Sequence, residues 1–151
     1  MYFDHHLCFF QMKASSKQEL FTIMSDRLYS EGFVKESYLE GISTREEEYP
    51  TAISVNGIGF AIPHTDSAHV NKSQICFASL QTPIEFFSMT DKSEKVPVKL
   101  VFMLAMSQPH EHAETLQNMI SLFQNEEAAN KLLSCTSVDE FTAILNDAKV
   151  Y

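Results

Sequence analysis

An unbroken apolar run from Leu100 to Met106 constrains the fold of this chain more than any other segment. It is far shorter than the roughly 20 apolar residues that a membrane-spanning helix requires. Branched and aromatic side chains follow one another in it without a polar position, which is typical of a strand covered on both faces. We therefore predict a central buried strand over Val98 to Met106.

Weaker patterns predict the remaining elements. Further strands are expected over Leu7 to Met12, Ile58 to Ile62 and Gln74 to Leu80. Helices are expected from a capping box at Ser16 to Glu19 as far as Gly32, from Lys35 to about Glu47 before Pro50, and in three stretches after Pro109, the last two over Glu126 to Leu133 and Ser137 to Leu145. The first helix should bury Leu20, Ile23, Met24 and Leu28. This order predicts an α/β fold, a mixed sheet of about four or five strands with helices on both faces in three layers.

Length and charge narrow the classes of function. A chain of 151 residues with 44% hydrophobic composition can bury one core, and we expect a single domain over residues 1–151. The net charge of −9 argues against nucleic acid and against an anionic membrane surface, because both are bound through clustered Lys and Arg. We expect no nucleic-acid partner.

The cysteines indicate a reducing compartment. Cys8, Cys76 and Cys135 are far apart, odd in number and without a Cys-x-x-Cys pair, so they predict neither a disulfide framework nor a structural zinc site. The N-terminus lacks the charged and then apolar layout of a signal peptide. We expect a cytoplasmic protein whose cysteines are buried.

The segment from Gly57 to Thr65 carries the strongest indication of chemistry. It is an apolar strand that contains glycines and ends in Pro63-His64-Thr65. Proline fixes its own φ and restricts Ile62 to extended geometry, so His64 is placed on a stiff backbone at the end of the strand. We expect its side chain at the surface, as a nucleophile.

The other histidines have less specific settings. His5, His6 and His69 lie in polar or terminal segments, where solvation is the ordinary state. His110 and His112 flank Glu111 in the predicted first turn of the helix after Pro109, where unsatisfied backbone N–H groups favour an anion. If this turn meets His64, a nucleophilic imidazole, a donor imidazole and backbone donors would surround a phosphoryl group.

The segment Gly57-Ile58-Gly59-Phe60-Ala61-Ile62-Pro63-His64-Thr65 resembles the active-site segment of a known family. The family is the fructose–mannitol class of enzyme IIA proteins of the phosphoenolpyruvate-dependent sugar phosphotransferase system. The resemblance covers nearly the whole chain, with the galactitol-type branch most similar. Supporting positions are Arg45-Glu46 before Pro50-Thr51, Pro83-Ile84-Glu85-Phe86, the Leu100 to Met106 strand, and His112 followed by Leu116.

The resemblance implies a role for three residues. His64 would receive a phosphoryl group from the phosphocarrier protein HPr and pass it to a cysteine of an enzyme IIB partner. A second histidine of the family stands at the start of the helix after the long apolar strand, where His112 fits better than His110. The family arginine corresponds to Arg45, expected to help orient the site. No cofactor and no metal are implied, and the membrane component, a partner only indirectly, selects the sugar.

Two alternatives belong to other classes of function. In the first, phosphorylation of His64 is a regulatory mark that alters binding to a transcription regulator or a transporter. In the second, His64, His110 and His112 form a metal site of hydrolytic type, although no further ligand stands at a supporting spacing. For partner docking around His64, the sequence offers Phe60, Ile62 and Phe86 as candidates for a supporting apolar wall, although strand residues of this kind more often belong to the core.

Overall fold

The structure is a computed structural model that describes residues 2–150. Within this range five strands form one mixed sheet in the order β1-β4-β5-β3-β2. The strands are β1 (Cys8–Met12), β2 (Ala52–Val55), β3 (Ile58–Ala61), β4 (Gln74–Phe87) and β5 (Lys95–Ala105). The helices are α1 (Lys17–Ser30), α2 (Tyr38–Glu48), the 3-10 turn η1 (Ser67–His69), α3 (Pro109–Gln124), α4 (Glu126–Ser134) and α5 (Val138–Asp147).

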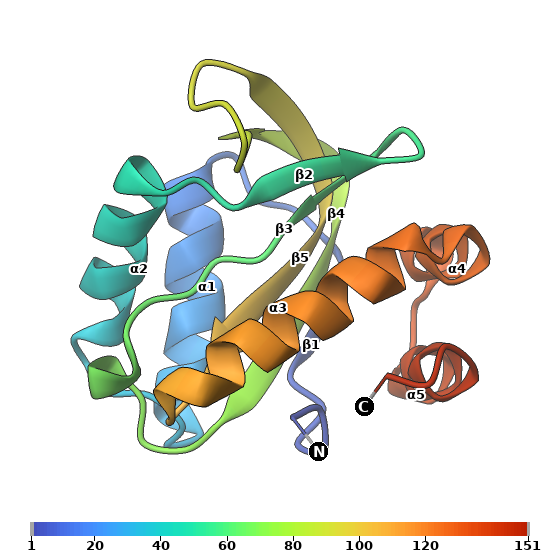
Figure 1. Cartoon of the computed structure of the whole chain (residues 1–151). Helices are drawn as coiled ribbons and strands as arrows, with labels where there is room; N and C mark the ends of the chain where they lie inside the picture. The colour runs from blue at the N-terminus through green and yellow to red at the C-terminus, as the bar shows by residue number, and fades with distance from the viewer. Residues whose placement is uncertain (1, 151) are drawn as a thin grey trace.

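The helices cover both faces of the sheet. Helices α1 and α2 lie against one face, and α3, α4 and α5 lie on the other (Figure 1). Each face has its own cluster of buried apolar side chains. The predicted three-layer α/β fold is therefore confirmed. None of the helices in residues 2–150 combines the length and the apolar character needed to cross a membrane.

Strand β5 is the central strand that the apolar run predicts. It pairs with β4 on one side and β3 on the other. Its side chains alternate between the two clusters: Val101 and Met103 pack with α1 and α2, whereas Phe102 and Leu104 pack with α3 to α5. Because both faces are buried from Leu100 onward, this part of the strand has no position where a polar side chain would be solvated, whereas Lys95 at its start is exposed.

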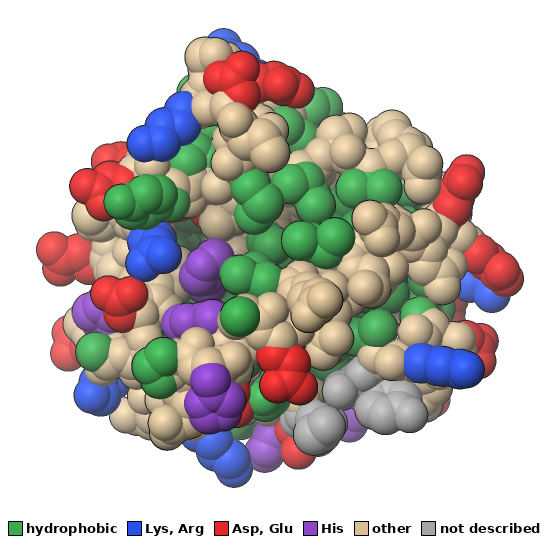
Figure 2. Space-filling model, viewed as in Figure 1, with side chains coloured by type: hydrophobic (Ala, Val, Ile, Leu, Met, Phe, Trp, Pro, Cys, Tyr) green, Lys and Arg blue, Asp and Glu red, His purple; other side chains and the backbone are tan. Residues whose placement is uncertain are grey.

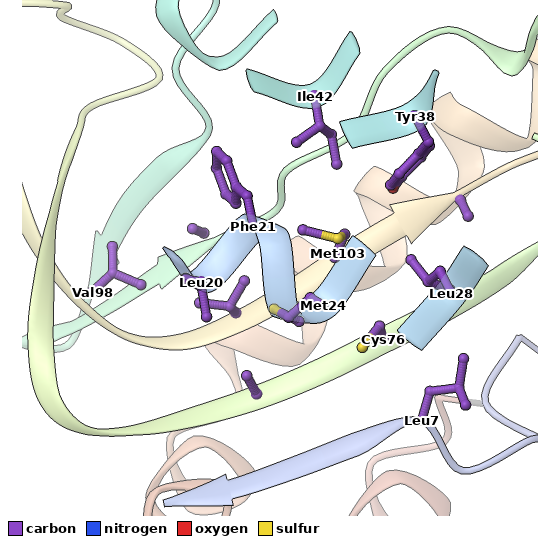
Figure 3. Packing of buried hydrophobic residues seen from close by; sticks show 14 of the residues in the cluster. Leu7, Leu20, Phe21, Met24, Leu28, Tyr38, Ile42, Cys76, Val98 and Met103 are labelled. Atoms are coloured by element: carbon purple, nitrogen blue, oxygen red, sulfur yellow. The ribbon is translucent and has the colours of Figure 1, made fainter. Parts of the chain in front are cut away.

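Helix α1 begins where predicted but buries a slightly different set of side chains. The Ser16 side chain accepts a hydrogen bond from the Glu19 backbone N–H, while the Glu19 carboxylate accepts one from Ser15 Oγ instead of closing the capping box. Phe21 is buried and Ile23 is only partly so. The core between α1, α2 and the sheet is shown in Figure 3, with labelled side chains from both helices and from the sheet.

Helix α2 starts three residues later than the sequence predicts, at Tyr38 instead of Lys35. The reason is tertiary. Val34 forms a bridge with Val70, and the Lys35 N–H donates to the His69 carbonyl at 2.9 Å. These contacts hold the chain extended before α2 and attach it to the segment that follows His64.

Strand β2 was not predicted. It forms a hairpin with β3 through Asn56 and Gly57, whose φ values of 53° and 81° match a type I′ turn. In β3, Gly59 is required by close packing, because a Cβ there would lie 2.0 Å from the Pro97 carbonyl oxygen. The glycines of this segment therefore have separate roles, one in the turn and one against β5.

Candidate functional site

The sheet topology brings the segment after β3 to the start of α3. Strands β3 and β5 are parallel neighbours, with Phe60 opposite Leu100 and Ala61 opposite Val101. The Leu104 N–H donates to the Pro63 carbonyl at 2.9 Å, so the pairing extends one step beyond β3. Carboxyl ends of parallel strands meet at one edge of a sheet. His64, which follows β3, therefore lies where β5 ends and α3 begins.

A hydrogen bond sets the tautomer of His64. Its Nδ1 lies 2.8 Å from the carbonyl oxygen of Ile62. A carbonyl oxygen can only accept, so Nδ1 carries the proton and donates it. In the neutral ring, Nε2 is then left with a free lone pair. The side chain is partly buried and partly exposed at the surface.

Burial keeps His64 neutral. Desolvation by the surrounding protein lowers its pKa below the ordinary 6.5, and the nearby charges of His112 and Arg45 act in the same direction. The hydrogen bond to Ile62 and the carboxylate of Asp66 act against this shift without reversing it. At pH 7 the imidazole is therefore available as a nucleophile.

His112 is the histidine that lies beside His64. The centroids of the two rings are 5.6 Å apart and the ring planes are inclined by 47°. Its Nε2 is buried and has no hydrogen-bond partner. Burial and the charge of Arg45 lower the pKa of His112 as well. His110, the alternative left open by the sequence, is exposed to solvent.

Arg45 reaches the same region from the last turn of α2. Its Nη1 lies 3.2 Å from Asp66 Oδ1, and its guanidinium is 5.1 Å from the centroid of the Tyr49 ring. Arg45 Nε is buried without a partner. Beside it, α2 and residues 65–69 line an open cleft of about 470 Å³. The three site residues expected from the sequence are thus brought to one edge of the sheet.

Unpartnered polar atoms are concentrated around His64. Within residues 2–150, three buried side-chain polar atoms lack a hydrogen bond: Arg45 Nε, Ser67 Oγ and His112 Nε2. Leaving such an atom unpaired costs about 1–3 kcal/mol. All three atoms belong to segments that adjoin His64. The free-energy cost of these missing hydrogen bonds is therefore concentrated where an incoming anion would find donors. Neither Asp66 nor Ser67 stands in a recognisable motif, so the sequence alone does not indicate them.

Of the remaining histidines, His69 belongs to the lining of the cleft beside Arg45. His5 and His6 are exposed, and His69 Nδ1 lies 2.8 Å from Ser37 Oγ. Among residues 2–150 no group of three or more His, Cys, Asp or Glu side chains is arranged to hold a metal ion. The alternative site of His64, His110 and His112 is therefore not formed by the described residues.

The three strand residues considered for an apolar wall around His64 belong to the core, the alternative that is more frequent for such residues. Phe60, Ile62 and Phe86 are fully buried, since strand side chains here face the two helical layers. Partly exposed apolar side chains instead come from β2 and α3, namely Ile53, Val55 and Leu116. Figure 2 shows histidine side chains beside a band of hydrophobic ones on the face that carries α3, with acidic residues mostly at its periphery.

The chain also matches a family model. Residues 1–148 match the family described as phosphoenolpyruvate-dependent sugar phosphotransferase system, EIIA 2. The chain belongs to this family.

The relatives include components for more than one sugar. The chain is 30% identical over 134 residues to the mannitol-specific phosphotransferase enzyme IIA component of Bacillus subtilis, with 88% of each chain covered. It is 24% identical over 118 residues to the galactitol-specific EIIA component of Escherichia coli K12, with 78% of each covered. The resemblance to the galactitol type is thus shared with mannitol-specific components.

A solved structure has the same fold. The match is to the complex of enzyme IIAMTL and phosphorylated enzyme IIBMTL from Escherichia coli, with a TM-score of 0.78 and 23% identity over 93% of this chain and 94% of that one. In that structure the IIA protein is bound to its phosphorylated IIB partner.

Proposed function

We propose that the chain is a phosphocarrier that accepts a phosphoryl group from HPr on Nε2 of His64 and passes it to a cysteine of an enzyme IIB partner. The observation that carries this proposal is the hydrogen bond from Nδ1 to the Ile62 carbonyl. This hydrogen bond leaves the free lone pair on Nε2. The lowered pKa keeps the ring neutral, and polar side-chain atoms without partners lie in the neighbouring segments. The family membership supports a phosphocarrier role.

The transfer needs no general base in this geometry. The Nε2 lone pair attacks phosphorus, the bond between phosphorus and the donor's leaving atom breaks, and that atom keeps the bonding electrons. Since Nε2 carries no proton before the attack, no proton has to leave it. The Nδ1–H group stays hydrogen-bonded to the Ile62 carbonyl. In the onward step the thiolate sulfur attacks phosphorus and the electron pair returns to Nε2.

His112 and Arg45 would stabilise the phosphoryl oxygens during both steps. Arg45 Nε always carries a hydrogen and has no partner in the resting protein. His112 Nε2, in the tautomer that protonates it, is a second free donor. Donors that are already oriented before the reaction stabilise developing charge without a reorganisation cost.

Reconstitution tests this proposal. The chain is incubated with enzyme I, HPr, phosphoenolpyruvate and magnesium, and intact mass reports phosphoryl uptake. We expect one phosphoryl group on the wild type and on His110→Ala, a matched control with an exposed histidine, and none on His64→Ala. Uptake at the normal rate by a folded His64→Ala variant would overturn the assignment.

A second stage distinguishes a relay from a regulatory mark. Phosphorylated chain is isolated and mixed with enzyme IIB from the same source. We expect loss of the phosphoryl group from His64 and its appearance on a IIB cysteine. A phosphorylated chain that transfers to no IIB protein would contradict the relay and favour the regulatory alternative.

A further inference from the structure

A hydrogen-bond network centred on Glu111 fixes the first turn of α3. Both carboxylate oxygens are occupied: Oε1 accepts from Ser73 Oγ at 2.7 Å and from the Gln108 N–H at 3.1 Å, and Oε2 accepts from Tyr2 Oη at 2.7 Å. The contact with Gln108 belongs to an ordinary capping box. The contacts with Ser73 and Tyr2 come from distant parts of the chain.

Ser73 links the same turn to the end of β5. Its Oγ accepts from the Ser107 N–H at 2.9 Å, in addition to donating to Glu111. The network therefore joins the N-terminal segment, the residue before β4 and the connection between β5 and α3. Burial acts to raise the pKa of Glu111, but the hydrogen bonds from Ser73 and Tyr2 outweigh it and the pKa is lowered, so the carboxylate is ionised at pH 7.

His112 follows Glu111 directly in the sequence, and no hydrogen bond holds the Nε2 atom of its ring. This nitrogen has no hydrogen-bond partner, although the ring must keep its place 5.6 Å from His64. Pro109 stiffens the start of α3, yet a helix terminus frays unless its end groups are bonded. The position of the His112 ring therefore depends on the backbone of the first turn of α3. The side chain of Glu111, the preceding residue, anchors this turn.

We propose that Glu111, held by Ser73 and Tyr2, is a positioning residue that keeps His112 in place for phosphoryl transfer. The inference rests on the proposed phosphocarrier function. A loss of order in this turn would not remove the nucleophile, since His64 is fixed separately by Ile62. It would displace a donor, and small displacements of a catalytic group reduce rates by one to two orders of magnitude.

A double-mutant cycle tests this proposal. The variant is Glu111→Gln, measured alone and in a His112→Gln background, and the control is Glu114→Gln, an exposed glutamate one turn away on α3. The measurement is the single-turnover rate constant of phosphoryl uptake from saturating HPr, with thermal unfolding to verify folding. We expect Glu111→Gln to slow uptake about tenfold, with little change in the concentration of HPr that gives half the maximal rate.

The dependence on His112 separates positioning from general stability. If Glu111 acts through His112, the tenfold loss disappears in the His112→Gln background, because the group being positioned is already gone. An equal loss in both backgrounds, or wild-type uptake by Glu111→Gln, would overturn the proposal. Failure of the wild type itself to accept phosphate would instead refute the phosphocarrier function.

Tyr2→Phe provides the same test without a change of charge. It removes a single hydrogen bond to Glu111 Oε2 and leaves the capping box intact. We expect a smaller loss of uptake rate, about two- to threefold, that also vanishes in the His112→Gln background. If Glu111→Gln does not fold, this variant decides the matter, and an unchanged rate would contradict the proposal.

Discussion

At the scale of single residues, the proposed transfer depends on which ring nitrogens of the two histidines are engaged in hydrogen bonds. His64 has Nδ1 engaged and Nε2 free, while His112 has its Nε2 buried and unpartnered. The first arrangement produces a nucleophile. The second, in the tautomer that protonates Nε2, leaves a donor that the resting protein does not use, which is why we propose different roles for the two rings.

A change at His112 should therefore affect the chemical step more than binding. We predict that His112→Gln lowers the rate constant of transfer from His64 to IIB by about a hundredfold, the size of effect seen when one transition-state donor is lost. The concentration of IIB at half-maximal rate should hardly change. His110→Gln, on the same turn but exposed, should transfer normally. A loss that lies entirely in partner affinity would show that His112 serves docking.

Glu46 gives the fold a pH dependence that is independent of catalysis. This buried carboxyl, 3% exposed, accepts hydrogen bonds from the Thr51 N–H and Oγ1. Burial raises its pKa from 4.5 to about 7, and the Thr51 hydrogen bonds offset only part of that shift. Because the folded pKa is raised, its contribution to stability is fully present below pH 4.5 and is lost as the pH rises through about 7.

Glu46→Gln should remove this dependence. We predict that the variant and the wild type have similar free energies of unfolding near pH 5, and that at pH 8 the variant is the more stable by up to roughly 3 kcal/mol. Urea denaturation across this range measures the difference. Glu47→Gln, an exposed neighbour, should follow the wild type at every pH. Parallel curves for Glu46→Gln and the wild type would contradict a raised pKa.

The sequence could indicate part of the site at this scale. Pro63-His64 indicated the proposed nucleophile, because proline stiffens the backbone locally, and the resemblance supplied Arg45 and His112. Asp66, Ser67 and Glu111 could not be found in this way. Asp66 and Glu111 make contacts with residues 21, 38 and more than 100 positions away, and the Ser67 hydroxyl is buried without a hydrogen-bond partner. No local sequence pattern encodes such features.

At the scale of elements, the site exists because β3 and β5 run parallel side by side. Gly59 allows this approach, since a Cβ would lie 2.0 Å from the Pro97 carbonyl oxygen and 3.1 Å from Val98 Cα. Both obstacles are backbone atoms, which cannot rotate away. The strand that precedes His64 is thus held against β5 at a distance that only glycine permits.

We predict that Gly59→Ala destabilises the protein by about 2 kcal/mol or more, because the β3–β5 pairing must open to admit a methyl group. Ser54→Ala is the matched control: Ser54 is the exposed partner of Gly59 across the β2–β3 hairpin, and its change should stay within about 0.5 kcal/mol. Denaturant unfolding compares the two variants. Equal stability of both would show that the sheet accommodates the methyl group freely.

Long apolar patterns predicted elements better than short ones did. β5 and the helices after Pro109 were predictable because their periodicity is sustained. β2 has four residues and depends on its hairpin with β3, so propensity alone does not identify it. β4 extends to Phe87 instead of Leu80 because its pairing with β5 resumes at Ile84 after an irregular, exposed stretch at residues 81–83.

At the scale of the whole molecule, the histidine site opens on a face that suits protein partners. Partly exposed Ile53, Val55 and Leu116 lie on the layer of β2 and α3, and Tyr49 at the end of α2 is 59% exposed. An apolar centre with charged residues at the rim is the usual composition of a protein–protein interface. Two partners that exchange a phosphoryl group with His64 in turn would have to use this same face.

Transfer by this chain should not require a divalent cation, because His112 and Arg45 offer donors of their own. We predict that a chelator leaves the transfer from phosphorylated His64 to IIB unchanged. The assay begins with isolated phosphorylated protein, since enzyme I upstream requires magnesium. Loss of transfer that zinc restores, while buffer alone does not, would favour a metal site.

Locating the phosphoryl group on a single ring atom tests the proposed transfer chemistry. The chain, labelled with ¹⁵N in histidine, is phosphorylated through enzyme I and HPr, and NMR identifies which ring nitrogen is bonded to phosphorus. We predict a single phosphoryl group on Nε2 of His64, with Nδ1 still protonated and hydrogen-bonded to the Ile62 carbonyl. A phosphoryl group on Nδ1 of His64, or on any other residue, would contradict it.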